Sequence, residues 1–129
     1  MLTLATTLCC HQVQQPVNFT TLSDRYSAFA TEFIGNTTHD PRPFFLYVPF
    51  SHIHTPQYVA TRNSGRSGKS GAAGHFYDTL LELDETVGSI MAALTENKLD
   101  ENTLVLVTGD NGPCECSSGR LGLSLLLRL

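Results

Sequence analysis

The stretch that decides the fold of this chain is residues 75–94, HFYDTLLELDETVGSIMAAL. Its apolar residues recur at alternating gaps of four and three, which is the period of a helix with one buried face. These residues are Phe76, Leu80, Leu83, Val87, Ile90 and Leu94. The carboxylates between them, such as Asp78, Glu82 and Glu85, are expected elsewhere around the helix. The dipeptide Asn97–Lys98 then suits a left-handed stop, so the sequence predicts one long amphipathic helix.

Two continuous apolar runs on either side of this helix are predicted as buried β-strands. They are residues 44–48, FFLYV, and residues 103–108, TLVLVT. Runs of this kind, without polar alternation, are typical of strands that are covered on both faces. A further helix is predicted upstream, from an N-cap at Ser23 to about Gly35. Its apolar face holds Leu22, Tyr26, Phe29 and Phe33.

The order of the predicted elements is helix, strand, loop, long helix and strand. This alternation indicates the α/β fold class, with a mostly parallel sheet flanked by helices. The loop, residues 59–74, is rich in glycine and serine and is expected to be mobile. In such sheets the chemistry lies beyond the carboxyl ends of the strands. Polar clusters follow both predicted strands here, SHIH at residues 51–54 and Asp110–Asn111.

Composition narrows the classes of partner. A chain of 129 residues allows one ordinary domain or part of one. The net charge of −4 and the low content of lysine and arginine argue against nucleic acid, which needs a clustered basic face. No membrane span is predicted, since the apolar end at residues 121–129 is short and contains Arg128. Residues 1–10 lack the positive region of a signal peptide, and the oligomeric state stays open.

Two sequons for N-glycosylation are present, Asn18-Phe19-Thr20 and Asn36-Thr37-Thr38. They predict glycans on Asn18 and Asn36 if the chain enters the secretory pathway, although such triplets also arise by chance. The cysteines form two close pairs, Cys9–Cys10 and Cys114/Cys116, from which no disulfide framework can be inferred.

The polar clusters after the two strands contain candidate ligands. Asp110 and Asn111 present hard oxygen atoms of the type that calcium or magnesium takes, but these residues also make a good turn after any strand. His52 and His54 are two apart, so both imidazoles point to one side of an extended segment. That spacing fits a transition-metal site, an anion site, or a pair of ordinary packed or solvated histidines. The residues alone leave these choices open.

Three separated motifs resemble the middle of the arylsulfatases of the sulfatase family in order and spacing. They are RPFFLY with HIHTP at residues 42–47 and 52–56, ELDETVG at residues 82–88, and TGDNGP at residues 108–113. Any one of them alone would be weak, but their agreement in content and separation is specific. The resemblance covers about residues 14–113.

The resemblance implies an alkaline-phosphatase-like fold and hydrolysis of sulfate esters, either small molecules or sulfated glycoconjugates, by a lysosomal or secretory enzyme. In this family a cysteine is converted to formylglycine, the nucleophile, and a divalent cation, usually calcium, holds the sulfate. Asp110 and Asn111 match two metal ligands of the family. His54 matches the histidine that contacts the substrate and acts in catalysis. A dianionic transition state needs a cation and oriented donors, which agrees with this set.

The chain departs from the family at the nucleophile. Neither the Cys-x-Pro-x-Arg motif nor the family's early pair of aspartate ligands occurs in it, and residues 116–120, CSSGR, follow the metal turn instead of preceding it. We therefore expect an internal fragment that is inactive alone. It comprises an irregular N-terminus (1–13), a partial sulfatase catalytic domain (14–113) and a divergent tail (114–129). Two alternatives remain, a non-catalytic isoform that binds the full-length enzyme and a phosphoesterase of the same superfold.

Overall fold

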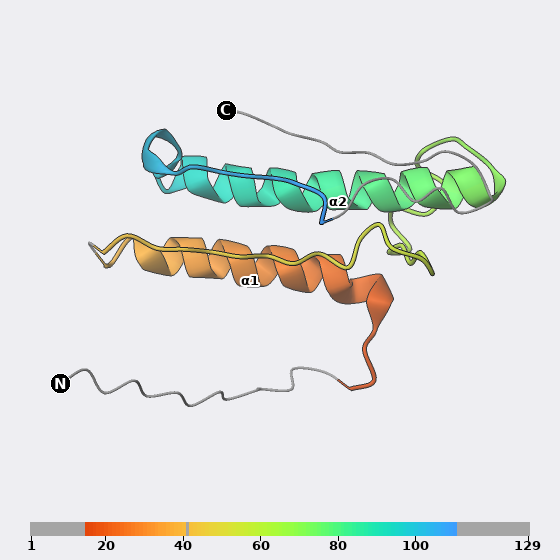
Figure 1. The fold of residues 1–129 in the computed structure, drawn as a ribbon, viewed down its shortest axis with the longest axis horizontal. Coiled ribbons are helices and arrows are strands. Elements are labelled where there is room, and N and C mark those ends of the chain that lie inside the picture. Colours follow the sequence, from red (N-terminus) through yellow and green to blue (C-terminus); the bar gives the residue numbers. More distant parts are fainter. Residues whose placement is uncertain (1–14, 41, 111–129) are drawn as a thin grey trace.

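Two parallel helices form the frame of the computed structural model, which describes residues 15–40 and 42–110 (Figure 1). The helices are α1, Leu22–Thr37, and α2, Gly71–Glu96. They lie side by side and run in the same direction, so that Ser23 meets Glu82 near one end and Ile34 meets Leu94 near the other. The predicted termini, residues 1–13 and 114–129, lie outside the described residues.

Helix α1 follows a short 3₁₀ turn, η1, at Phe19–Thr21. The predicted N-cap at Ser23 is wrong, because Thr21 occupies that position and Ser23 is buried inside the helix. The side chain of Ser23 donates to a carboxylate of α2 instead of capping its own helix. The small residue Ala30 is also buried on the face towards α2, whereas Phe29 is 66% exposed. Small side chains on this face allow close approach of the helices.

Helix α2 confirms the long helix that the sequence predicts. Its C-cap is Asn97, and Lys98 adopts a φ of 58°, the left-handed stop expected at this position. A second 3₁₀ turn, η2, at Asp100–Asn102, leads into the last extended segment. At the other end Gly74 approaches the preceding loop closely, since a Cβ there would lie 2.5 Å from the Lys69 carbonyl oxygen.

The buried face of α2 differs from the predicted one. Phe76 and Leu94 are buried as expected, but Asp78 and Glu82 are buried as well, whereas Leu80 and Leu83 are only half-buried. The physical reason is that the first half of α2 packs against a loop and a serine that offer N–H and O–H donors. Buried carboxylates need such donors, so this half of the helix presents a polar face.

The two predicted strands are extended segments in the structure, and no strand forms among residues 15–40 and 42–110. The segment 44–50 lies along α1, with ring contacts from Phe44 to Phe33 and from Phe50 to Tyr26. The segment 103–108 lies along α2. A strand requires ladder hydrogen bonds to a neighbour, and the described part of the chain supplies none to these segments. The expected parallel sheet is therefore not confirmed.

An apolar core joins the C-terminal halves of the helices. Ile34, Ala93 and Leu94 form its centre, and half-buried side chains from α2, from the turn after it and from both extended segments pack against it. These half-buried residues are Phe44, Leu46, Ile90, Met91, Leu99 and Val105. None of the helices in the described ranges is long and apolar enough to cross a bilayer.

Candidate functional site

The two polar clusters that the sequence singles out follow the two extended segments. Both segments run opposite to the helices, and both reach their carboxyl ends near the middle of α2 in the view of Figure 1. The cluster at residues 51–54 follows the segment along α1, and Asp110 follows the segment along α2. The two segments therefore run in the same direction, as parallel strands would, although no sheet forms in the described ranges.

His54 is exposed, and its hydrogen bonds to other described residues are local. Its Nδ1 lies 2.5 Å from the carbonyl oxygen of Thr55, and its backbone N–H donates to the Ser51 carbonyl oxygen at 3.3 Å. A carbonyl oxygen can only accept, so Nδ1 must hold the proton in this contact. The other ring nitrogen, Nε2, is left available to a ligand.

His52 lies in a different environment from His54. Its side chain is 5% exposed, and its Nε2 lies 3.5 Å from Glu82 Oε1, the distance of an ion pair when the imidazole is protonated. Its Nδ1 is buried and has no hydrogen-bond partner in the described part of the chain. The two histidines thus do not form a symmetrical pair, since one is packed inside and the other faces solvent. This argues against a shared transition-metal site.

Asp110 is exposed at the bend where the second extended segment ends. The predicted second ligand, Asn111, lies outside the described residues. Within the described ranges no three His, Cys, Asp or Glu side chains converge as they would around a metal ion. The carboxylate of Asp110 has the donor chemistry that calcium takes, but calcium needs six to eight oxygen ligands. The described residues therefore supply one possible ligand of a calcium site and not a complete set.

The loop that follows the histidine cluster is anchored, and its predicted mobility is not observed. Three carboxylates one turn apart on α2 hold it. Asp78 accepts backbone N–H groups of Gly65 and Ser67 at 2.6 and 2.7 Å, and Glu82 accepts that of Ala60 at 2.6 Å. The third carboxylate, on Glu85, accepts from the Asn63 amide at 2.8 Å and pairs with Arg66.

These donors favour the ionised form of two of the carboxylates. The Ser67 backbone N–H, together with that of Gly65, lowers the pKa of Asp78. The Asn63 amide and the Arg66 guanidinium lower the pKa of Glu85. The charged groups of α2 and the loop therefore stabilise one another.

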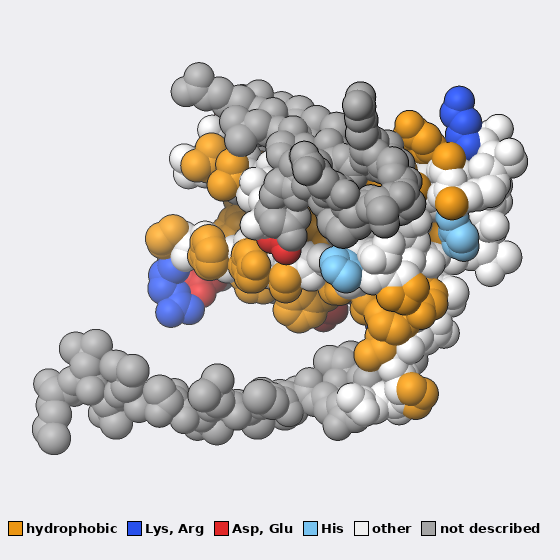
Figure 2. Space-filling model, turned by 45° about the vertical axis from the view of Figure 1, so that its right-hand side comes forward, with side chains coloured by type: hydrophobic (Ala, Val, Ile, Leu, Met, Phe, Trp, Pro, Cys, Tyr) orange, Lys and Arg blue, Asp and Glu red, His pale blue; other side chains and the backbone are white. Residues whose placement is uncertain are grey.

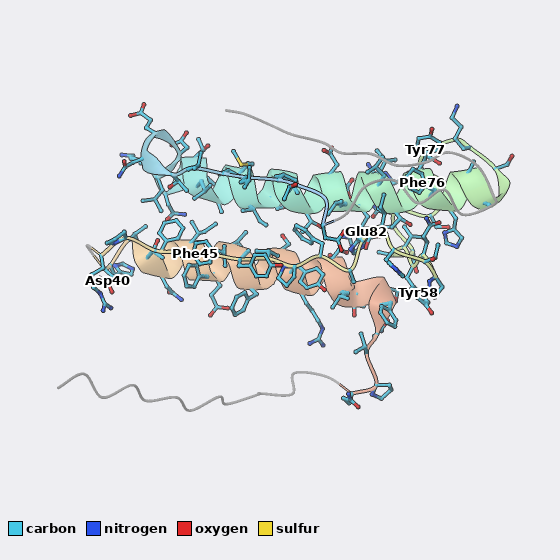
Figure 3. All side chains as sticks on the ribbon, viewed as in Figure 1. Asp40, Phe45, Tyr58, Phe76, Tyr77 and Glu82 are labelled. Atoms are coloured by element: carbon cyan, nitrogen blue, oxygen red, sulfur yellow. The ribbon has the colours of Figure 1, made fainter. Side chains whose placement is uncertain are left out.

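Sequence reasoning missed the buried role of Glu82. This side chain is 0% exposed and lies between the two helices (Figure 3). The only signal in the sequence was its position, because Glu82 lies one residue before Leu83 and so borders the apolar stripe of α2. Asp84, which borders the same stripe on its other side, is exposed. Position next to the stripe therefore does not by itself identify the buried carboxylate.

Comparison of the chain with known proteins identifies its family. The Sulfatase family model matches residues 6–118, and the chain belongs to this family. It is 42% identical over 114 residues to arylsulfatase A of Homo sapiens, which covers 88% of this chain and 22% of that protein. It is also 39% identical over 103 residues to arylsulfatase G of Homo sapiens, covering 78% and 18% respectively. The chain thus spans about a fifth of the length of these relatives.

N-Acetylgalactosamine-6-sulfatase of Canis lupus familiaris is a further relative, 33% identical over 111 residues, which are 83% of this chain and 20% of that protein. All three relatives are sulfatases by name, which confirms the family resemblance of the motifs at residues 42–56, 82–88 and 108–113.

Proposed function

We propose that this chain is part of the catalytic domain of an arylsulfatase-type sulfuric ester hydrolase. In this proposal it supplies one substrate-contacting histidine, His54, and two calcium ligands, Asp110 and Asn111. The observation that supports it most strongly is the family match over residues 6–118, within which the two polar clusters follow extended segments that run in the same direction. The substrate is a sulfate ester, either a small molecule or a sulfated glycoconjugate.

The geometry of His54 is suited to a sulfate ester. With Nδ1–H donated to the Thr55 carbonyl oxygen, Nε2 is the ring nitrogen left to meet a ligand, on a residue that is exposed. An imidazole nitrogen in this state exchanges a proton with a reacting oxygen, which is general acid–base chemistry. We assign this role to His54 on the substrate side of the site.

The calcium ligands are proposed from the chemistry of their donor atoms. Asp110 and Asn111 provide hard oxygen ligands on one turn, and the remaining ligands must come from outside the described residues. When bound, the cation supplies positive charge where sulfate oxygens gather negative charge. No Cys-x-Pro-x-Arg motif for formylglycine occurs in the 129 residues. We therefore propose that the 129-residue chain alone does not turn over a sulfate ester.

The extended segments are proposed to be strands of the sheet in a whole sulfatase domain. Their side chains alternate, so that Phe44 and Val105 pack on the core while Phe45 and Leu104 are 87% and 91% exposed. Figure 2 shows such exposed apolar side chains gathered over α1 and the segment beside it. In a whole domain, the apolar side chains that are exposed here would be covered by a neighbouring layer. Further strands would pair with the backbone edges of these segments.

A chimera tests the proposed activity. Human arylsulfatase A would carry residues 14–113 of this chain in place of its own matching segment, and hydrolysis of an aryl sulfate would be measured. We expect activity that depends on calcium, and a loss of about 100-fold or more in kcat for His54→Ala, the range of a general acid–base group. The matched control is His39→Ala, which removes an exposed histidine at the far end of α1.

The same chimera separates the rival classes. Faster hydrolysis of a phosphate ester than of the sulfate ester would favour a phosphoesterase. An active chimera in which His39→Ala reduces kcat as much as His54→Ala would remove the assigned role of His54. Asp110→Ala is expected to raise the calcium concentration needed for half-maximal activity.

We further propose passage through the secretory pathway, with glycans on Asn18 and Asn36. Both asparagines are exposed, and Asn18 Oδ1 accepts hydrogen bonds from the backbone N–H and hydroxyl of Thr20 within its own sequon, at 3.2 and 2.7 Å. Expression in a mammalian secretory system should give a chain whose mass falls on glycosidase treatment, and each Asn→Gln variant should remove one glycan.

A further inference from the structure

Glu82 is the only side chain described here that joins the histidine segment, the loop and α1 at a single carboxylate. Oε1 accepts a hydrogen bond from the hydroxyl of Ser23 in α1, and it lies 3.5 Å from Nε2 of His52. Oε2 accepts the backbone N–H of Ala60 at 2.6 Å. All three partners converge on a group that is fully buried. Figure 3 shows Glu82 at this junction between the helices.

Burying a carboxylate costs more free energy than a contact between two helices requires. Removing a carboxylate from water costs several kcal/mol unless donors compensate it, and the opposite end of the same helix pair packs with Ile34 and Leu94 at no such cost. The cost is offset here by donors from three separate segments. A carboxylate in this position therefore fixes segments relative to one another, which an apolar side chain cannot do with the same directionality.

Two of the three contacts lie on either side of His54. His52 precedes it by two residues and Ala60 follows it by six, so Glu82 holds both ends of the segment 53–59. Among the described residues, the hydrogen bonds of His54 are to Ser51 and Thr55, its own neighbours. Its position relative to the helices therefore depends on how the segment is held. The stacked rings of Phe19 and Tyr58, 4.4 Å apart, support the same segment from η1.

The other two carboxylates of α2 hold a different part of the chain. Asp78 binds Gly65 and Ser67, and Glu85 binds Asn63 and Arg66. None of these contacts lies on the segment that contains His54. This difference provides a control within the same helix and the same loop.

We propose that Glu82 is a positioning residue for His54, and that it acts by holding His52 and Ala60 on either side of it. The proposal deepens the function proposed above and rests on it for the chemistry of His54. Glu82 does not touch the substrate in this scheme. Its effect is to restrict the direction in which the imidazole of His54 is presented.

The test uses the full chain and requires no turnover. The ¹H–¹³C spectrum of the histidine imidazoles, assigned with His→Gln variants, reports the environment of His54, and amide hydrogen exchange reports the Ala60 N–H. Glu82→Gln turns one acceptor oxygen into an NH2 donor, so the side chain can no longer accept from both Ser23 and the Ala60 N–H, and we expect a shifted or split His54 resonance. Glu82→Leu removes both acceptors, and we expect about tenfold faster exchange at Ala60, the factor for one lost hydrogen bond. In Glu85→Gln both signals should match the unmodified chain.

A second variant covers the case in which Glu82→Gln does not fold. His52→Ala removes one contact and keeps those of Ser23 and Ala60, so the helices remain joined. Its His54 resonance should still shift. A purely structural carboxylate would lower the melting temperature without moving the His54 resonance of the folded chain. That result, or an equal shift in Glu85→Gln, would overturn the proposal.

The two proposals fail in different ways. An inactive chimera together with a displaced His54 resonance in Glu82→Gln would count against the sulfatase assignment alone. An active chimera together with an unchanged His54 resonance would count against the positioning role alone.

Discussion

The two ends of the α1–α2 interface are held together by different interactions, apolar contacts at one end and hydrogen bonds to a buried carboxylate at the other. At one end Ile34, Ala93 and Leu94 form an apolar contact, which the extended segments cover further. At the other end Ser23 and Glu82 meet through a buried hydrogen bond, beside a loop held by carboxylates. The apolar end requires only shape and area. The polar end requires donors at fixed positions, so it defines where each segment lies.

This difference teaches why the polar end is the one next to the candidate site. Apolar contacts are not directional, and they tolerate small shifts of one element against another. Hydrogen bonds to a carboxylate weaken steeply when the geometry changes. A site that must present His54 in one direction therefore gains from a polar junction, and the apolar end supplies the stability that this junction does not.

The largest expected effect is at the apolar end. Leu94→Ala removes a side chain that is 2% exposed and should lower the free energy of unfolding by about 2–5 kcal/mol. Urea unfolding followed by circular dichroism measures this change. Leu81→Ala is the matched control, since Leu81 lies on the same helix and is 36% exposed. Equal losses for the two leucines would contradict the assignment of the core.

The next largest effect is expected when the buried carboxylate at the polar end is replaced by an apolar side chain. Glu82→Leu leaves the buried donors of Ser23 and Ala60 without their acceptor, and we expect a loss of about 1–3 kcal/mol, the cost of an unsatisfied buried group. The double variant Ser23→Ala with Glu82→Leu should recover part of this loss. A single variant as stable as the original chain would show that the carboxylate adds nothing at this end.

A smaller effect should follow from acid. The pKa values of Asp78 and Glu85 are lower in the folded chain than when unfolded, so the folded chain binds fewer protons. Their contribution to stability is present above the ordinary carboxyl pKa of about 4 and is lost as the pH falls through the lowered values. The protection of the Gly65 and Ser67 amides against exchange, relative to the intrinsic rate at each pH, should therefore fall below about pH 4, before protection in the apolar end does. Simultaneous loosening of both ends would argue against a separate acid-sensitive loop.

The smallest effect concerns the surface of the polar end. Arg62 pairs with Asp24 at 2.7 Å, but both side chains are about half exposed. Exposed ion pairs contribute about 0–1 kcal/mol, so Arg62→Ala should shift the unfolding midpoint little, and less still in high salt. A loss comparable to that of Glu82→Leu would mean that the surface pair, and not the buried carboxylate, holds the loop.

Much of the architecture could be predicted from local patterns. The spacing from Phe76 to Leu94 predicted α2, and Asn97–Lys98 predicted its stop, because helical period and left-handed termination are local properties. The runs 44–48 and 103–108 are extended, but they form no strand in the described ranges, and the exposure of Phe45 and Leu104 differs from the predicted burial on both faces. Their pairing into a sheet could not be tested in the same way, since a ladder depends on which backbone lies alongside, and residues 15–40 and 42–110 offer none.

For the candidate site too, some features could be predicted from the sequence and others could not. Motif order identified the family and singled out His54 and Asp110, and the extended segments that precede them run in the same direction. The burial of His52, the exposure of His54 and the role of Glu82 could not be predicted. Each depends on which donors from distant segments surround a side chain, and residue type does not encode that.

The sequence by itself therefore determined the helices, the extended segments and the membership of the sulfatase family, because period, turn chemistry and motif spacing are properties of neighbouring residues. Only the tertiary structure decided that a glutamate and a serine, 59 positions apart, meet in a buried contact. The balance between the desolvation of a carboxylate and its hydrogen bonds is set by segments that fold together from different parts of the chain.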